Sequence, residues 1–307
     1  MRISGFTFIR NGVRLGYPFV ESIRSALPLV DEFVVAVGAS DDGTHEALGE
    51  LVRTHGAGKV RLVEMQWNTQ APAAFVYAAQ SMAALYNCTG DWALYLQGDE
   101  VLHEDDADNI RGAVEDADRS PRVEGLVFDY LHFYGSPRTI VKSPAWYRRE
   151  VRIVKNRAIK VVMPSDAQYF VAINGRRRLR YLRCRSANAR VFHYGWARPS
   201  PEHAAKVQTT NQMYHTTLVS KARDAVDPAT IHPFTGTHPA IMAQWVAAAD
   251  GPFTPDPAYK PSIKDLRQRL KAGIEAVLPV DLSARHFKLV PSSGAAQRVP
   301  LPRAAAL

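Results

Sequence analysis

The fold is decided by one stretch of the sequence, Asp91-Trp92-Ala93-Leu94-Tyr95-Leu96-Gln97-Gly98-Asp99-Glu100. Residues 92–96 are an unbroken apolar run, which is typical of a strand buried on both faces of a parallel sheet. From Gln97 onward the side chains are polar, small or acidic. Ligands of open α/β sheets bind beyond the carboxyl ends of the strands, so these acids are candidates for binding a divalent cation. A solvated turn after the strand is the plainer alternative.

Strands and helices alternate on both sides of this stretch. Short apolar or β-branched runs predict strands at residues 2–9, 32–38, 60–65 and 124–133. Apolar residues at helical spacing and helix-ending glycines predict helices at residues 17–29, 44–55, 73–87 and 106–118. Alternation of this kind predicts βαβ units and a mainly parallel sheet.

After residue 135 the alternation stops. Strand-like pieces joined by Pro, Gly and Asn loops predict an antiparallel or mixed extension of the sheet. Helices are predicted again at 201–224, 239–249 and 262–277, and the last of them is strongly amphipathic. The sequence therefore predicts an α/β fold whose mixed, mostly parallel sheet is sandwiched by helices, with a helical C-terminal extension.

The net charge of +8 is unevenly distributed. Between Arg138 and Arg198 there are sixteen Lys and Arg but only two acids, Glu150 and Asp166. Such a block favours an anionic partner, namely a nucleotide diphosphate, a lipid surface or a nucleic acid, with a solvated basic face as the alternative. The sequence has no zinc-finger spacing, RNP-type motif or basic heptad region, so nucleic acid ranks last and we expect no nucleic-acid partner.

The sequence favours a cytoplasmic protein. No apolar run reaches the ~20 residues that span a bilayer, and the N-terminus lacks the features of a signal peptide. Cys88 and Cys184 have no CxxC spacing, which argues against both a zinc site and a disulfide framework. The basic stretch at 176–185 predicts contact with an anionic acceptor or with an anionic membrane, in which case the protein would lie on the inner face of that membrane. A solvated hairpin is the alternative.

Several common motifs are absent. Neither GxGxxG nor GxxxxGK[ST] occurs, and there is no GxSxG elbow. Two features remain at the expected carboxyl edge of the sheet: the polar loop Ser40–Thr44 and the acidic strand end that begins at Gln97. One can hold a nucleoside and the other a metal-bridged diphosphate.

Over residues 1–200 the chain resembles the family 2 glycosyltransferases of the GT-A fold. Three motifs carry the resemblance: the opening strand that ends at Arg10-Asn11, Ser40-Asp41-Asp42-Gly43-Thr44, and Gly90 to Glu100, which looks like the metal-binding DxD region. The resemblance implies an enzyme that moves a sugar from a nucleotide-diphospho-sugar to a hydroxyl of a glycan or lipid-linked acceptor. It also implies an inverting reaction that uses Mn²⁺ or Mg²⁺, in glycan or cell-envelope polysaccharide synthesis.

The resemblance also implies site residues. Asp99 would bind the metal, with His193 as a second ligand. The alternative for His193 is a structural histidine at the edge of the core, with its hydrogen bonds satisfied by the protein. The implied nucleotide-sugar-binding residues are Arg10, Asn11, Gly38, Ser40, Asp42, Gln97, Arg149 and Arg152. Gln97 replaces the first Asp of DxD, Gly38 replaces an Asp that reads the nucleoside, and Met82 stands where Asn is common. These departures leave the nucleotide open.

Inverting members of the family carry a carboxylate base later in the chain than DxD. Asp166 lies in a Pro-Ser-Asp loop, where it can face a cleft, although a turn-forming Asp is the alternative. Glu150 is the other candidate catalytic residue, and its arginine neighbours favour a plain salt bridge.

The resemblance implies a division of the chain into parts. We expect a glycosyltransferase domain over 1–200, with a nucleotide-sugar half at 1–134 and an acceptor half at 135–200. A helical extension over 201–290 and a flexible tail over 291–307 would follow. A catalytically inactive sugar- or lipid-binding relative and a nucleotidyltransferase are the alternative functions.

Overall fold

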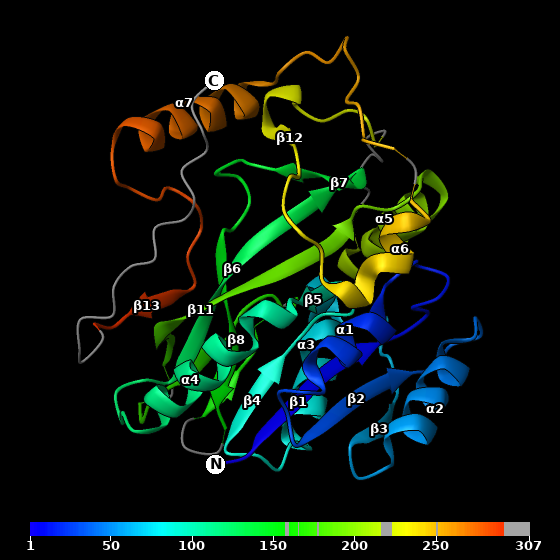
Figure 1. Cartoon of the computed structure of the whole chain (residues 1–307), viewed down its shortest axis with the longest axis vertical. Helices are drawn as coiled ribbons and strands as arrows, with labels where there is room; N and C mark the ends of the chain where they lie inside the picture. Colours follow the sequence, from blue (N-terminus) through cyan, green and yellow to red (C-terminus); the bar gives the residue numbers. More distant parts are fainter. Residues whose placement is uncertain (157–159, 165, 177, 216–222, 250, 292–307) are drawn as a thin grey trace.

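One mixed β-sheet runs through the protein, with helices on both of its faces (Figure 1). The computed structural model describes residues 1–156, 160–164, 166–176, 178–215, 223–249 and 251–291. Four strands form its parallel half, in the order β3 (Val60–Met65), β2 (Glu32–Gly38), β1 (Ile3–Ile9) and β4 (Trp92–Tyr95). β4 is the apolar run of the deciding stretch, and all four of its residues are buried, as predicted.

The other half of the sheet is mixed. β8 (Arg149–Lys155) is antiparallel to both β4 and β6 (Gly125–Tyr134), and the long β11 (Leu179–Trp196) runs parallel to β6. Shorter strands complete the sheet: β5 (Glu100–Leu102), β7 (Ser136–Val141), β9 (Val161–Val162), β10 (Val171–Ile173), β12 (Ile231–Pro233) and β13 (Phe287–Leu289). The predicted mixed extension after residue 135 is confirmed. The pairing of β12 with β7 and of β13 with β11 was not predicted.

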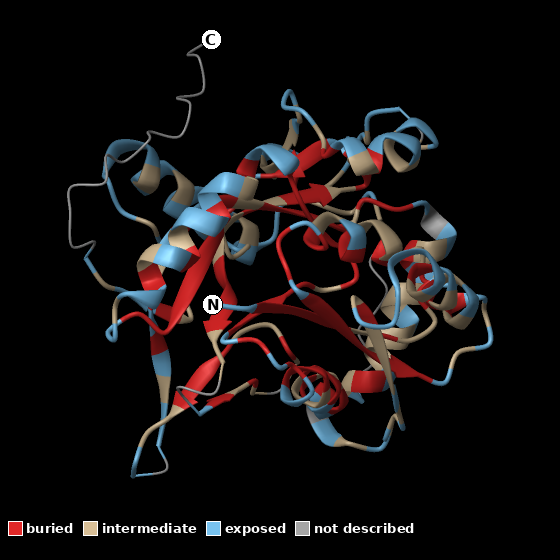
Figure 2. Ribbon diagram, turned by 60° about the horizontal axis from the view of Figure 1, so that its bottom comes forward, coloured by how far each residue is buried: buried red, intermediate tan, exposed pale blue. Residues whose placement is uncertain are grey.

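Successive side chains of a strand point to opposite faces, and this alternation creates two cores. Phe33, Val35 and Val37 of β2 pack with α1 (Phe19–Ala26), α2 (Thr44–His55) and α4 (Ala107–Asp118). Val34 and Ala36 pack on the other face with α3 (Phe75–Tyr86). Figure 2 shows the strands as largely buried, while the helices expose their outer faces. The predicted fold class is confirmed.

The first four predicted helices and the one at 262–277 agree closely with the structure, whereas the helix predicted at 239–249 is a 3₁₀ turn followed by a five-residue helix. The predicted helices at 17–29, 44–55, 73–87 and 106–118 correspond to α1, α2, α3 and α4. Further along lie α5 (Ser200–Tyr214), α6 (Ala243–Ala247) and α7 (Ile263–Val277), with short 3₁₀ turns at Pro72–Ala74, Glu104–Asp106, Pro228–Thr230 and Ala240–Met242. None of the helices in the described ranges has the length and apolar character that crossing a bilayer requires. The predicted tail lies outside the described residues from 292 onward.

The basic stretch at 176–185 is partly engaged in ion pairs. Its described C-terminal part opens β11, and two of its arginines bind one buried carboxylate. Arg180 Nη2 lies 2.6 Å and Arg183 Nη2 lies 3.0 Å from Glu124 Oε1. Glu124 offsets only one of these two charges, and Arg176 and Arg178 are exposed, so contact of this stretch with an anionic partner stays a prediction.

Candidate active site

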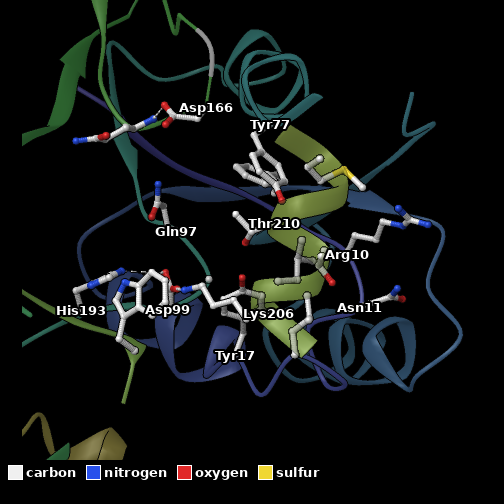
Figure 3. A pocket seen from close by; sticks show the side chains of 18 of the residues that line it. Arg10, Asn11, Tyr17, Tyr77, Gln97, Asp99, Asp166, His193, Lys206 and Thr210 are labelled. Atoms are coloured by element: carbon white, nitrogen blue, oxygen red, sulfur yellow. Dashed lines mark hydrogen bonds and ion pairs between the residues drawn. The ribbon is translucent and has the colours of Figure 1, made fainter. Parts of the chain in front are cut away.

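A cavity of about 300 Å³ opens at the carboxyl ends of β1 and β4 (Figure 3). The loop after β1 lines it with Arg10 and Asn11, and the loop after β4 lines it with Gln97 and Asp99. The third loop joins them through a side chain, because Ser40 Oγ accepts a hydrogen bond from Asn11 N at 3.0 Å. The three loops therefore converge on one edge, as the sequence predicted. Helix α5 closes the cavity with Lys206, Thr209, Thr210, Met213 and Tyr214.

Asp99 is buried at the floor of this cavity among cationic groups. Its Oδ2 lies 3.1 Å from Lys206 Nζ and 3.8 Å from Arg198 Nη2, and its Oδ1 lies 3.8 Å from His193 Nε2. Lys206 Nζ also donates to Gly195 O at 2.8 Å. A Cβ at Gly195 would lie 2.5 Å from Asp99 Oδ2, so only glycine allows this close approach.

The ionisation of this cluster leaves a positive surplus. Burial by itself raises the pKa of Asp99, but the neighbouring Lys206 and Arg198 cations lower it below its ordinary value. Burial lowers the pKa of Lys206 to about 8, against the opposing effect of Asp99, so the amine remains mostly protonated at neutral pH. Two cations and one carboxylate give a net charge of +1 in a buried place. A buried surplus of this kind favours an anionic ligand.

Arg198 also contributes hydrogen-bond donors beside Asp99. Its guanidinium is buried, stacks at 4.5 Å over the ring of Tyr17, and donates through Nη1 to Leu15 O. Within the described part of the chain its Nε and Nη2 have no hydrogen-bond acceptor. Buried donors of this kind are rare in native proteins and call for a ligand or water.

His193 presents a bare nitrogen to Asp99. His132 Nε2 donates to Tyr147 O at 2.7 Å, so in the neutral ring Nδ1 is an acceptor. His193 Nδ1, 3.0 Å away, must then donate to it, and its Nε2 keeps a lone pair toward Asp99. Burial lowers the pKa of both histidines, which keeps them neutral.

Two side chains at this point are candidate ligands for a divalent cation. The Nε2 lone pair of His193 and Oδ1 of Asp99 are two adjacent acceptors that cannot hydrogen-bond each other. A carboxylate oxygen suits Mn²⁺ and Mg²⁺, and Mg²⁺ is commonly bound by one or two carboxylates plus substrate phosphates. Among the described residues no group of three or more His, Cys, Asp or Glu side chains forms a metal site, so substrate oxygens and water would supply the other ligands.

Aromatic side chains form the opposite end of the cavity. Phe8 and Tyr77 stack with centroids 5.7 Å apart, Trp67 meets Tyr77 edge-on at 5.8 Å, and Arg10 lies over Trp67 at 5.5 Å. Asn11 Oδ1 and Trp67 Nε1 are buried, line this end and have no partner among the described residues. One free acceptor and one free donor beside aromatic faces can bind a nucleobase or ribose.

Asp166 also lines the cavity and lies between Gln97 and Tyr77 in the view of Figure 3. Tyr214 Oη donates to its Oδ2 at 2.9 Å, and Gln168 N donates to its Oδ1 at 3.3 Å. Gln97 Nε2 donates to Ala167 O at 3.3 Å and so links the loop after β4 to the Asp166 loop.

The structure does not bring three of the predicted residues to the cavity, and the prediction must be corrected for them. Glu150 is fully buried elsewhere, where Oε2 lies 2.8 Å from His286 Nδ1. Arg149 pairs with Asp281 at 3.0 Å. Arg152 is also fully buried and pairs with a glutamate of the deciding stretch, so its charge cannot reach a ligand.

The polar loop after β2 supports the site from outside the cavity lining. Gly38 leaves room for Trp67, because an added Cβ would clash with the indole Nε1. Asp42 accepts hydrogen bonds from Arg14 N at 2.7 Å and from Thr44 Oγ1 at 2.6 Å. Ser40 accepts from Asn11 N. These residues shape the loop that holds Asn11, and we assign them a positioning role.

Sequence reasoning missed the contribution of helix α5. Lys206 lies 107 positions after Asp99 in a helix that was predicted only as part of a C-terminal extension. A single lysine in a weakly amphipathic helix carries no local signal of a site. Arg198 and the aromatic wall residues Tyr17, Trp67 and Tyr77 were missed for the same reason, because their partners are distant in sequence.

No family model and no curated protein matches the sequence. Solved structures with a similar backbone include TarS of S. aureus, with 12% identity over 73% of this chain and 42% of that chain, at a TM-score of 0.40. Residues 1–349 of TarS in complex with UDP-GlcNAc match with 15% identity over 73% of this chain and 70% of that chain, at a TM-score of 0.38.

A further similar structure is glucosyl-3-phosphoglycerate synthase from Mycobacterium tuberculosis, in complex with Mn²⁺, UDP and phosphoglyceric acid. It shows 18% identity over 43% of this chain and 43% of that chain, at a TM-score of 0.29. This chain thus spans less than half of the length of TarS and of the synthase. Both proteins have been crystallised with UDP-sugars.

Proposed function

We propose that this protein is a glycosyltransferase that moves a sugar from a nucleotide-diphospho-sugar to an acceptor hydroxyl. The observation that carries the proposal is the buried positive surplus around Asp99, which faces a cavity with an aromatic end. The aromatic end suits the nucleoside, and the cationic floor suits the diphosphate. A hydroxyl acceptor would then approach from the side of Asp166.

The reaction we propose is a direct displacement at the anomeric carbon. The bond between this carbon and the diphosphate oxygen breaks, and a bond to the acceptor oxygen forms. Asp166 takes the acceptor proton as general base, with Tyr214 and Gln168 fixing its two oxygens. Displacement from the opposite face inverts the anomeric configuration.

Charge that develops on the leaving diphosphate needs preorganised cations. Lys206 supplies one of them in the cavity wall, and Arg198, which lies behind the lining residues, adds positive charge beside Asp99. Asp99 Oδ1 and His193 Nε2 would hold the divalent ion, which supplies further charge neutralisation when bound. Asp99 also keeps the Lys206 ammonium directed at the floor of the cavity.

A panel of nucleotide-diphospho-sugars tests the proposal. A donor that binds raises the melting temperature by mass action, and hydrolysis of that donor measured with and without Mn²⁺ reports turnover. A protein that binds a donor but never turns it over in the presence of any acceptor would be an inactive sugar-binding relative. Failure of every nucleotide-sugar to bind would contradict the proposal itself.

Lys206→Met is expected to weaken binding of a nucleoside diphosphate ~10- to 100-fold, because one charge-assisted contact to phosphate is lost. Binding of the free nucleoside should change little, since the aromatic end is intact. Calorimetric titration of both ligands in EDTA provides the measurement. Lys264→Met, on the exposed surface of α7, is the matched control. Equal losses for nucleoside and diphosphate would contradict the role of Lys206.

Asp166→Asn is expected to lower turnover by ~10²-fold or more while the donor affinity stays close to that of the wild type. The amide keeps the shape of the side chain and its contact with Tyr214 but cannot take a proton. Separate measurement of kcat and of donor Kd checks this. If the variant loses donor binding but keeps the wild-type kcat, Asp166 belongs to the donor site.

A further inference from the structure

Helix α7 presents its apolar residues to solvent instead of to the core. Ile263, Leu266, Leu270, Ile274 and Val277 are spaced by three, four, four and three positions, which places them in one stripe. Ile263 is 72%, Leu270 67% and Val277 82% exposed, and no residue of α7 is buried. An amphipathic helix ordinarily packs this stripe against the protein.

The opposite side of the helix is polar and faces the protein. Its half-buried residues, again spaced by three, four and three, are Asp265, Gln268, Ala272 and Glu275. Glu275 pairs with Arg148, and Arg269 Nε donates to Asp227 Oδ2 at 2.9 Å. These ion pairs fix the rotation of the helix, so the apolar stripe cannot turn inward without breaking them.

The beginning of α7 is also fixed. Ser262 and Asp265 form a capping box, in which Ser262 Oγ accepts from Asp265 N at 3.3 Å and Asp265 Oδ2 accepts from Ser262 N at 2.7 Å. Tyr259 Oη adds a hydrogen bond to Asp265 at 2.8 Å. A capped helix of 15 residues is about 22 Å long, and it lies at one end of the molecule, away from the parallel strands (Figure 1).

Basic residues border the stripe on one side. Lys264, Arg267 and Lys271 are exposed and have no ion-pair partner within the described ranges. The acids of α7 are engaged: Asp265 caps the helix and Glu275 binds Arg148. The outward side of the helix therefore combines an apolar stripe with three uncompensated positive charges.

We propose that α7 lies in the surface of an anionic lipid membrane, with the stripe among the acyl chains and the basic residues at the headgroups. Helices of this composition bind in the interface plane through apolar burial and attraction to anionic lipids. A second copy of the chain fits less well. A second helix of the same kind would cover the stripe but would offer the three cations no free carboxylate, because the acids of α7 are already engaged. The inference does not depend on the proposed glycosyl transfer.

Sedimentation of the full chain with vesicles tests the proposal. We expect binding to vesicles of phosphatidylcholine with about 30% phosphatidylglycerol, weaker binding to phosphatidylcholine alone, and weakening by salt. Leu266→Ser with Leu270→Ser should lower the partition coefficient ~100-fold, since two apolar side chains no longer bury. Tyr86→Ser, at an exposed aromatic of α3, is the matched control and should bind as the wild type does.

A charge variant separates the two contributions. Lys264→Gln with Lys271→Gln should weaken binding to anionic vesicles ~10-fold and leave binding to neutral vesicles unchanged. Arg24→Gln with Arg122→Gln removes two exposed charges elsewhere and should have no effect. Wild-type protein that does not sediment with anionic vesicles would overturn the proposal. So would a dimer in solution that Leu270→Ser dissociates, because the stripe would then be a protein interface.

Discussion

Arg152→Met, with Glu100 left in place, is expected to lower the free energy of unfolding by about 3–5 kcal/mol, because it leaves an uncompensated buried charge. The wild-type pair is bidentate: Arg152 Nε and Nη2 donate to the two oxygens of Glu100, each at 2.8 Å. Both side chains are completely buried. The rings of Tyr95 and Tyr130 flank the guanidinium, each with its centroid 5.2 Å away.

The same pair supports the site, because Glu100 Oε2 accepts from Gln97 N at 3.1 Å. Urea unfolding gives the stability change, and Arg53→Met is the control. Arg53 pairs with Glu50 on the surface, where loss of a pair costs less than about 1 kcal/mol. Adding Glu100→Gln to Arg152→Met should recover part of the loss, because the unpaired buried charge is then removed. If Arg152→Met and Arg53→Met lower the free energy of unfolding equally, the buried pair stabilises the protein no more than the surface pair does.

Asp99→Asn is expected to reduce turnover of a nucleotide-sugar by ~10³-fold and to abolish any gain in diphosphate affinity on adding Mn²⁺. The amide cannot serve as an anionic ligand beside His193 Nε2, and it no longer directs the Lys206 ammonium by charge. Titration of a nucleoside diphosphate in EDTA and in Mn²⁺ provides a measurement that is independent of turnover.

Comparison with Lys206→Met sharpens this test. Asp99→Asn should keep metal-free diphosphate binding at or above the wild-type level, because it removes a negative charge from the floor of the cavity. Lys206→Met should lose metal-free binding and keep the Mn²⁺ response. If Asp99→Asn retains the full Mn²⁺ response, then Asp99 is not the metal ligand.

Local sequence signals were sufficient for the architecture of the first 134 residues. An apolar run that ends abruptly in polar and acidic residues is typical of a strand buried on both faces, so residues 92–100 predicted both the burial of β4 and the polar character of its carboxyl end. The same reasoning located Asp99, Gln97, Arg10 and Asn11, which line one cavity in the structure. Alternation and helical spacing are local properties, and they need no knowledge of distant partners.

Pairing between distant residues could not be read in this way. Sixteen basic residues between 138 and 198 look equivalent in sequence, yet Arg152 is neutralised by Glu100 whereas Arg198 keeps unpaired donors beside Asp99. Which of them binds a ligand depends on which acid the fold places next to each one. Lys206 became a site residue only because α5 crosses the ends of β1 and β4.

The sequence by itself determined the helix at 262–277 and its amphipathic character, since both depend on spacing alone. It could not determine which side of that helix faces outward. The ion pairs of Glu275 with Arg148 and of Arg269 with Asp227 decide this, and they join residues 127 and 42 positions apart. The local pattern thus defined the elements and the strand end that carries Asp99. Only the tertiary structure decided which charges remain uncompensated, because compensation depends on contacts between segments far apart in the chain.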